Sequence, residues 1–456
     1  MNEIASAVPA ESNTLSRSLR PRHVTMIAIG GIVGAGLFVG SSAAIAGAGP
    51  AILVTYALTG FLVLLIMRML GEMAVGMPQI RSFTEFARVG LGNWAGFSVG
   101  WLYWFFWVVV VPVEAIAGAA ILEKWIAMPT WEIGVVLMAI MTAVNLLSAR
   151  AYGEFEFWFS SIKVTAIVAF ILVAAAYAFG LISQGGSGFS NLTAHGGFAP
   201  SGWLAALAAV TTVIFSMMGA EIVTIAAVES PEPARAVARM SSSVITRILI
   251  FYVGSILMVL CVVPWNLVVP GESPFTLALD TMHIPFASTI MAWIILTAVL
   301  SCLNSAFYVC SRVLFVLAGH GDAPRWLVKT NKRQVPSHSV MLASVAGFAG
   351  VIAAILSPSR VFAFLLNASG ALIVYIYLAI AVSQVRVRMK NEREGKPPVL
   401  PMWLFPWLSY FAIAGFLAVL VALAITPARF AEFWTSAISV AVALAAYAAV
   451  RRNRHG

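Results

Sequence analysis

Charged side chains are scarce in this chain, and their scarcity excludes most kinds of soluble protein. Aspartate, glutamate, lysine and arginine together make up 10% of the 456 residues, whereas an average soluble domain carries about 25%. Hydrophobic residues make up 61%, and the mean hydropathy is +0.95. This composition leaves too little polar surface for a water-soluble fold and indicates a protein that crosses a membrane several times.

Cysteine and histidine are also rare, and neither forms a pattern that points to chemistry. The cysteines, Cys261, Cys302 and Cys310, lie in apolar stretches without the spacing of a metal site or a disulfide framework. We expect them to be small packing residues. The six histidines are scattered through loops and termini. The sequence therefore predicts no metal, no cofactor and no hydrolytic site, and we do not expect an enzyme.

Acidic residues are outnumbered, with 18 against 27 basic residues and a formal net charge of +9. A basic protein can bind nucleic acid, but the distribution of charge argues against that here. With a cytoplasmic N-terminus, the basic residues fall mainly in cytoplasmic loops, and the opposite face keeps only Lys124, Arg360 and Arg429. This positive-inside bias predicts that both termini are cytoplasmic and that the surface contacts the lipid bilayer, not nucleic acid.

Long apolar runs are abundant. A helix needs about 20 apolar residues to cross a bilayer, and we identify twelve such segments. The first is full length and follows a polar start, so we expect a span and not a cleaved signal peptide. The predicted spans are Val24–Ala46, Ala51–Val75, Trp94–Leu122, Trp131–Ser148, Phe155–Leu181, Trp203–Val228, Val244–Val263, Pro285–Leu317, Ser339–Ile355, Val361–Ser383, Pro406–Ile425 and Phe433–Val450.

Two predicted spans contain residues that weaken a helix. The first carries Gly30-Gly31-Ile32-Val33-Gly34-Ala35-Gly36, and the sixth carries Phe215-Ser216-Met217-Met218-Gly219-Ala220-Glu221. At membrane depth, freed backbone groups are tolerated only where they face protein or a polar cavity. A close-packing face for a neighbouring helix is the alternative for the first run. Two broken helices, one opening each half of the first ten spans, favour a midplane substrate site in an inverted-repeat transporter.

Ionisable residues inside the spans are the next candidates, because charge at membrane depth is costly and usually functional. Glu114 lies in the third span and Glu221 follows the interruption in the sixth. Lys163 lies at a depth similar to the glycine run and to Asn304 and Ser305. It is predicted to lie near freed carbonyls, either as a proton carrier or as a structural lysine paired with Glu114 or Glu221.

Further carboxylates lie near the ends of spans. Glu229 is either a residue of an inner gate or an ordinary helix-end carboxylate. Glu154 and Glu156 begin the fifth span, where a negative charge complements a helix N-terminus. We expect these two residues to be structural. Glu221 either lines the substrate pathway or tethers the interrupted segment.

Motifs over nearly the whole chain resemble those of one family. These motifs are Arg22–Met26, Gly40–Ser42, Gly47–Pro50, Met67–Met73, Tyr152–Trp158, Gly219–Glu229, Ser301–Ser305, Ser311–Arg312 and Gly321–Pro324. On these residues the chain resembles bacterial amino acid permeases of the amino acid-polyamine-organocation superfamily, in its amino acid transporter branch. Within that family, the run from Gly100 to Glu114 and the sixth span are most similar to gamma-aminobutyrate permeases.

The resemblance implies an all-α polytopic membrane protein with a five-plus-five inverted repeat and two additional C-terminal helices. It divides the chain into a cytoplasmic segment (1–23), a first repeat (24–181), a second repeat (182–383), two further spans (384–450) and a cytoplasmic tail (451–456). It implies proton-coupled import of an amino acid across the inner membrane by alternating access. Gamma-aminobutyrate or a similar omega-amino acid is the expected substrate. An alpha-amino acid permease or an exchanger of the same family is the alternative, and the oligomeric state is left open.

The resemblance also implies roles for single residues. The amides of Gly34, Ala35 and Gly36, with Gly30 at the start of the break, would take the substrate carboxylate. The carbonyls of Ile29, Phe215, Ser216 and Met218 would take the ammonium. Lys163 matches the family lysine that stands where sodium-coupled relatives bind a cation. Independently of the resemblance, we assign Glu221, Asn304 and Ser305 to proton coupling beside it. We add the inference that Glu114 receives an ammonium held far from the carboxylate, as in an omega-amino acid.

Overall fold

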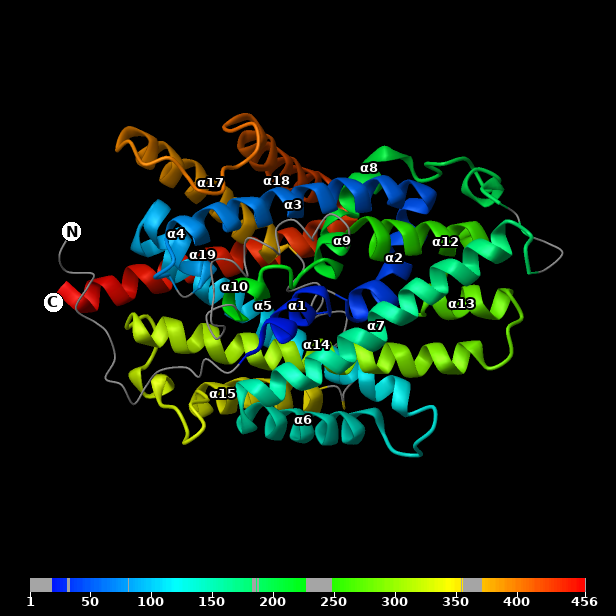
Figure 1. Cartoon of the computed structure of the whole chain (residues 1–456), viewed down its shortest axis with the longest axis horizontal. Helices are drawn as coiled ribbons and strands as arrows, with labels where there is room; N and C mark the ends of the chain where they lie inside the picture. Colours follow the sequence, from blue (N-terminus) through cyan, green and yellow to red (C-terminus); the bar gives the residue numbers. More distant parts are fainter. Residues whose placement is uncertain are drawn as a thin grey trace.

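All regular elements in the described part of the chain are helices. The computed structural model describes residues 19–30, 33–80, 82–182, 186, 188–226, 248–353, 355 and 371–455. Figure 1 shows an elongated bundle in which most long helices run along the longest axis of the molecule and are joined by loops at its two ends. The described residues thus agree with an all-α membrane protein.

The helices of the first half are short around the first interruption and long after it. They are α1 (Pro21–Gly30), η2 (Gly36–Gly40), α2 (Ser41–Ala48), η3 (Gly49–Ala51), α3 (Ile52–Gly76), α4 (Phe83–Leu91), α5 (Asn93–Leu122), α6 (Thr130–Leu147) and α7 (Ala149–Ala178). Gly49 allows the chain to turn between α2 and α3, because its φ of 62° is in the left-handed region that glycine favours.

The helices of the second half show the same contrast between short and long elements. They are η4 (Ser190–Leu192), α8 (Gly202–Ala208), α9 (Val210–Ser216), α10 (Ile222–Ala226), η6 (Ile248–Gly254), α12 (Ser255–Val262), η7 (Trp265–Leu267), α13 (Pro274–Thr281), α14 (Ala287–Gly319), η8 (Arg325–Val328), α15 (Ser337–Ala353), α17 (Leu372–Arg393), α18 (Trp407–Ile425), η9 (Pro427–Arg429) and α19 (Phe430–His455).

Eight helical stretches in the described residues are long and apolar enough to cross a membrane. Three more apolar helices are shorter than a full span: Gly202–Ser216, Ile250–Val262 and Ser337–Ala353. The stretch Gly36–Gly76 is 41 residues long, about twice the length that one crossing needs. A span that is interrupted in mid-membrane consists of two helices, each too short to cross the bilayer. A criterion based on helix length therefore misses such spans.

The spanning helices differ in how much of their apolar surface is buried within the protein. About 72% of the apolar window of α5 and 67% of that of α14 is buried, against 33% for α18 and 11% for α19. α14 packs against both α5 and α7, and α1 packs against α7. The last two helices therefore leave most of their apolar surface free for lipid, and α5, α7 and α14 surround the interrupted segments.

The tenth predicted span ends later than the sequence indicated. α17 continues to Arg393 instead of ending at Ser383. Arg388 explains the extension locally, because it pairs with Glu392 one turn on at 2.7 Å and with Glu72 of α3 at 3.5 Å. Apolarity marks where a helix leaves the bilayer, and not where the helix itself ends.

The short helix α4 lies between the long helices α3 and α5 in the chain. Ser82 caps it by accepting the Thr84 amide, and Phe83 and Phe86 are buried. The helix packs against α5 and α17. Its Arg88 pairs with Glu85 and with Asp322, which follows α14. Ion pairs thus hold this short helix against the end of α14.

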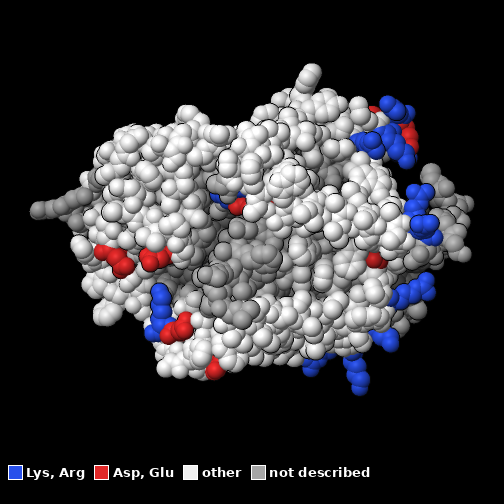
Figure 2. Space-filling model, turned by 180° about the vertical axis from the view of Figure 1, so that it is seen from behind, with Lys and Arg blue, Asp and Glu red and all other residues white. Residues whose placement is uncertain are grey.

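Basic side chains gather at one end of the bundle. In Figure 2, which shows the molecule from behind, lysine and arginine cluster at the right-hand end and acidic side chains are prominent toward the left. The clustered residues include Arg386, Lys390 and Arg393 of α17. The charge asymmetry in the sequence is therefore an asymmetry between the two ends of the folded molecule.

Candidate functional site

The interruption of the first span lies between α1 and η2. Val33 and Gly34 are not helical, and the helix resumes at Ala35. The Gly34 carbonyl accepts the amides of Leu37 and Phe38 at 3.2 and 3.4 Å. The amides at the start of this outer half lack acceptors within the helix, and the helix dipole places partial positive charge there. The position suits an anion such as a carboxylate.

The interruption of the sixth span follows α9. The chain turns over residues 217–221, with Gly219 at a φ of 109°, and becomes helical again at Ile222. Two carbonyls of this break already have donors: the Phe215 carbonyl accepts the Met218 amide at 3.3 Å, and that of Ser216 accepts the Tyr252 hydroxyl at 2.5 Å. A carbonyl oxygen has two lone pairs, so each retains the capacity to accept a further donor.

The two interruptions lie against each other. A Cβ atom placed on Gly36 would lie 2.7 Å from the Cα atom of Ser216, closer than real Cβ atoms approach backbone. The residue at position 36 must therefore be glycine for the two broken helices to approach this closely. The close approach brings the amides of the first break and the carbonyls of the second to one place.

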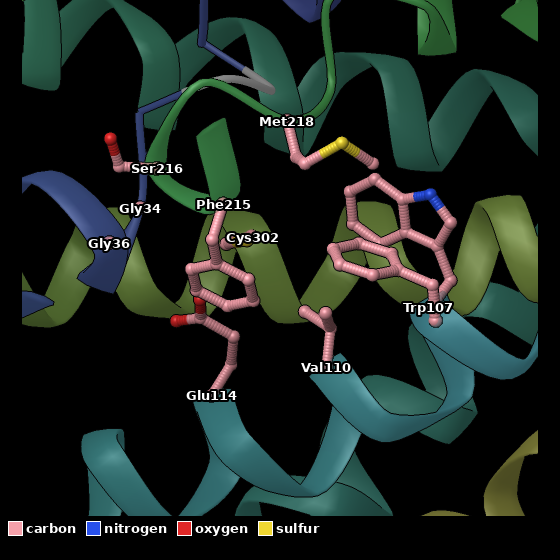
Figure 3. A pocket seen from close by; sticks show the side chains of 10 residues that line it. Gly34, Gly36, Trp107, Val110, Glu114, Phe215, Ser216, Met218 and Cys302 are labelled. Atoms are coloured by element: carbon pink, nitrogen blue, oxygen red, sulfur yellow. The ribbon is translucent and has the colours of Figure 1, made fainter. Parts of the chain in front are cut away.

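A narrow cavity of about 20 Å³ lies at this meeting point. Figure 3 shows its walls: the two breaks on one side, α5 below them and α14 behind. The lining residues are Gly34, Gly36, Phe106, Trp107, Val110, Glu114, Phe215, Ser216, Met218 and Cys302. The walls are largely apolar, with backbone polar groups and one carboxylate, as in sites for small organic ligands.

Glu114 supplies that carboxylate. Its side chain is 1% exposed, and its Oε2 atom has no hydrogen-bond partner among the described residues. The carboxylate lies beside the Ala35 backbone amide and the Cys302 thiol. Its Oε1 atom is 3.4 Å from the place that a Cβ of Gly34 would occupy. Burial of a carboxylate costs free energy unless a cation or hydrogen-bond donors compensate its charge, so this site favours a ligand that supplies them.

Lys163 lies behind the first interruption and is fully buried. Its ammonium donates to the Val33 carbonyl at 2.9 Å and to the Ser301 hydroxyl at 2.8 Å. The Glu156 carboxylate lies at ion-pair distance, 3.8 Å. The buried charge thus has a partner that is neither Glu114 nor Glu221, the two partners that the structural interpretation of Lys163 had named.

The two candidates on α14, Asn304 and Ser305, have different hydrogen-bond partners. Ser305 donates to the Glu156 carboxylate at 3.3 Å and is therefore connected to Lys163 through that residue. Asn304 accepts from Asn145 of α6 at 2.9 Å. The hydroxyl that meets the ammonium belongs to Ser301, one helical turn before Ser305.

Glu221 is fully buried at the end of the second interruption. Tyr103 of α5 and Tyr377 of α17 each donate to one of its carboxylate oxygens at 2.9 Å. The Gly219 amide donates to the same carboxylate at 3.3 Å. The carboxylate does not line the cavity, and its contacts agree with the tethering alternative for this residue.

The remaining candidates lie at the edges of the site or outside the described residues. Ile29 and Gly30 form the last two positions of α1. Glu154 pairs with Arg22 at 2.6 Å and with His23 at 3.1 Å, and so ties α1 to α7. Glu229 lies in the segment 227–247, which is outside the described residues.

Several residues at the site were not predicted from the sequence as functional candidates. Glu156 was expected to be a structural carboxylate at a helix start, yet α7 begins at Ala149 and buries Glu156 completely. The sequence offered one signal that Glu156 lies near Lys163. The two residues are seven positions apart, and residues two helical turns apart share a helix face. Trp107 and Cys302 gave no such signal, because apolar and small residues fill every span.

No metal site was found in the residues that the structure describes: no three histidine, cysteine, aspartate or glutamate side chains there could hold an ion together.

The comparisons with known proteins all point to the same family. The model of the amino acid permease family matches residues 23–454. A probable GABA permease of Pseudomonas aeruginosa is 47% identical over 442 residues, covering 95% of this chain and 93% of that protein. The gamma-aminobutyric acid permeases of Bacillus subtilis and Escherichia coli K12 are 44% and 46% identical, covering 96% and 92% of this chain and 94% and 91% of their own lengths. The chain therefore belongs to the amino acid permease family, whose members are membrane transporters and not enzymes.

Proposed function

We propose that this protein imports gamma-aminobutyrate, or a similar omega-amino acid, together with protons. The observation that carries this proposal is the buried Glu114 carboxylate at a cavity between two interrupted helices. The substrate class is supported by three relatives that are 44–47% identical and are named as permeases for gamma-aminobutyrate.

The cavity supplies groups for both charges of such a substrate. The amides of Gly34, Ala35 and Gly36 receive the carboxylate. The ammonium lies between Glu114 and the carbonyls of Ile29, Phe215, Ser216 and Met218. Because Glu114 stands beside the Ala35 amide, a simple anion would be repelled by it. A zwitterion brings its own cation into this space, and a chain of methylene groups lets that cation reach Glu114 while the carboxylate stays on the amides.

The transport cycle that we propose is alternating access in a twelve-span protein of the inner membrane with both termini cytoplasmic. Its first ten spans form two inverted repeats, over residues 24–181 and 182–383. The interrupted spans close around the substrate from either side. Lys163 carries the coupling proton, and its contact with Val33 connects its protonation to the shape of the first interruption. No further cofactor takes part.

Uptake of radiolabelled gamma-aminobutyrate into proteoliposomes tests the proposal directly. With an imposed inward proton gradient, we expect accumulation that disappears when the gradient is dissipated. Omega-amino acids should compete better than alpha-amino acids. Better competition by alpha-amino acids would assign the protein to the alpha-amino acid alternative. Uptake that requires amino acid inside the vesicles would show an exchanger in place of a symporter.

A further inference from the structure

Glu156 is a buried carboxylate beside Lys163 to which the transport cycle proposed above assigns no role. Its side chain is 0% exposed, and three serine hydroxyls donate to it: Ser301 at 2.6 Å, Ser160 at 3.0 Å and Ser305 at 3.3 Å. A purely structural counter-ion for Lys163 would need only the side of the carboxylate that faces the ammonium. Here the second oxygen is also engaged, on the side away from Lys163.

The contacts of Glu156 form a continuous hydrogen-bonded path. On one side, the Ser301 hydroxyl donates to Oε1 and accepts from the Lys163 ammonium at 2.8 Å. On the other side, the Ser305 hydroxyl donates to Oε2 and shares a hydrogen bond of 3.1 Å with the Tyr152 hydroxyl. Either oxygen of this last pair can be the donor, so a proton can pass in both directions.

The path runs toward the basic end of the bundle. Lys163 and Tyr152 are eleven residues apart on α7, which is about 16 Å along a helix axis. The Tyr152 ring stacks on Tyr308 at 4.0 Å, and the guanidinium of Arg312 lies 4.0 Å from the Tyr308 ring. Tyr152 is itself 1% exposed and lies three residues after Ala149, where α7 begins. The path therefore leads from the buried ammonium toward the first turn of α7.

From this geometry we propose that Glu156 is the proton acceptor of Lys163 and that Ser305 and Tyr152 conduct the proton onward to the cytoplasm. The proposal rests on the proton coupling that we proposed above and gives it a route. Glu156, Ser305 and Tyr152 touch no substrate in this scheme and act on transport only through Lys163.

The proton step balances without any other reactant. An N–H bond of the Lys163 ammonium breaks as its proton moves to the Ser301 oxygen, and the hydroxyl proton of Ser301 moves to Oε1 of Glu156. The ammonium becomes an amine and the carboxylate becomes a carboxylic acid, with no change of oxidation state. The pair is neutral before and after. A lysine that lost its proton without this acceptor would leave Glu156 as an uncompensated buried charge, which is strongly destabilising.

Release of the proton uses the side of the carboxyl group that faces Ser305. Rotation about the Cγ–Cδ bond of Glu156 brings the protonated oxygen to that side. Glu156 then donates its proton to the Ser305 oxygen, and the Ser305 hydroxyl donates its own proton to Tyr152. The proton that leaves Tyr152 passes to water at the cytoplasmic end, and the carboxylate is restored. Reprotonation of Lys163 in the opposite conformation completes the cycle.

The test separates proton flux from substrate movement in proteoliposomes. Tyr152→Phe keeps the ring on Tyr308 and removes only the hydroxyl, and Ser305→Ala removes the preceding link. Gamma-aminobutyrate accumulation and dye-reported proton entry are measured under a proton gradient, and exchange of labelled for unlabelled substrate is measured without one. We expect accumulation and proton entry to fall about tenfold or more, because a positioned proton-transfer group contributes about 10²-fold or more. Exchange should persist, because it needs no net proton movement.

Ser161→Ala is the matched control, because that hydroxyl donates only within its own helix, to the Phe157 carbonyl at 2.7 Å. It should leave both accumulation and exchange unchanged. Wild-type accumulation and proton entry in both relay variants would overturn the relay, and so would an equal loss of accumulation and exchange, which marks a structural role. If the wild-type protein itself moves gamma-aminobutyrate without protons, the proposed coupling fails, and the relay fails with it.

Discussion

The ammonium of Lys163 donates to the carbonyl oxygen of Val33 at 2.9 Å, at the point where the first span is interrupted. The same ammonium donates to Ser301 of α14. One buried cation thus joins α7, α14 and the break between α1 and η2. Loss of its proton would remove the positive charge and one of its three N–H donors, and so would weaken the contacts that join these segments.

We expect Lys163→Gln to lose gradient-driven accumulation of gamma-aminobutyrate. The substitution removes the cation from a buried pair with Glu156, and breaking such a pair costs about 3–5 kcal/mol. Uptake with and without an imposed proton gradient measures the effect. Lys124→Gln, in an exposed loop, is the control for a lost lysine. Normal accumulation and pH dependence in Lys163→Gln would remove Lys163 from the coupling mechanism.

We expect Gly36→Ala to weaken substrate binding about tenfold or more. The new methyl group would lie 2.7 Å from the Ser216 backbone, and overpacking of this kind costs about 1–3 kcal/mol. Gly47→Ala is the matched control, since no atom lies within 4 Å of a Cβ there. Binding is measured by scintillation proximity in detergent. Equal affinities for the two variants would show that the breaks can separate without cost.

Glu114→Gln should weaken binding of gamma-aminobutyrate more than that of alpha-amino acids. The amide keeps the shape of the side chain but cannot neutralise an ammonium, so the affinity for an omega-amino acid should fall about tenfold or more. Competition by a panel of both classes against a labelled substrate measures the ratio. An equal loss for both classes would make Glu114 a structural residue.

Tyr103→Phe and Tyr377→Phe should each destabilise the protein by about 1.5–3 kcal/mol, because each removes a hydrogen bond to the buried Glu221 carboxylate. Thermal unfolding of the detergent-solubilised protein measures the loss. Both bonds end on one carboxylate, so the double variant should deviate from additivity. Additive losses would indicate that the two hydroxyls act independently of Glu221.

The ion cluster of α4 should make the solubilised protein sensitive to acid. Burial alone would raise the pKa of Glu85, but the hydrogen bond from His320 and the charge of Arg88 outweigh burial and hold that pKa below its usual value. A carboxyl group with a depressed pKa stabilises the folded state above its unfolded pKa of about 4.3, and this stability is lost as the pH falls through the folded pKa.

Glu85→Gln should therefore lower the melting temperature at neutral pH and flatten its decline below about pH 4.5. Exposed Glu272 provides the control substitution, Glu272→Gln. If the wild-type protein and Glu85→Gln had the same melting temperature at every pH, the ionised Glu85 would contribute nothing to stability.

Much of this site was accessible from sequence because membrane depth imposes simple rules. The glycine run around Gly34 and Gly36 favoured a break, with a close-packing face as the alternative, and Lys163 was expected to face protein because charge at membrane depth is costly. The pairing of Lys163 was not accessible. Glu156 and Ser301 are 145 residues apart in sequence, and only the packing of α7 on α14 brings them to 2.6 Å.

The sequence by itself determined the all-helical membrane class, the two interruptions and the end of the molecule that carries the basic residues, because each of these depends on local composition and on the bilayer. Only the tertiary structure decided which groups meet. It placed Glu114 beside the first break, Glu221 between Tyr103 and Tyr377, and Ser301 next to Lys163. Apolar side chains on every face of a spanning helix hide its rotation and its neighbours, so the partners of a buried charge are fixed by packing between helices.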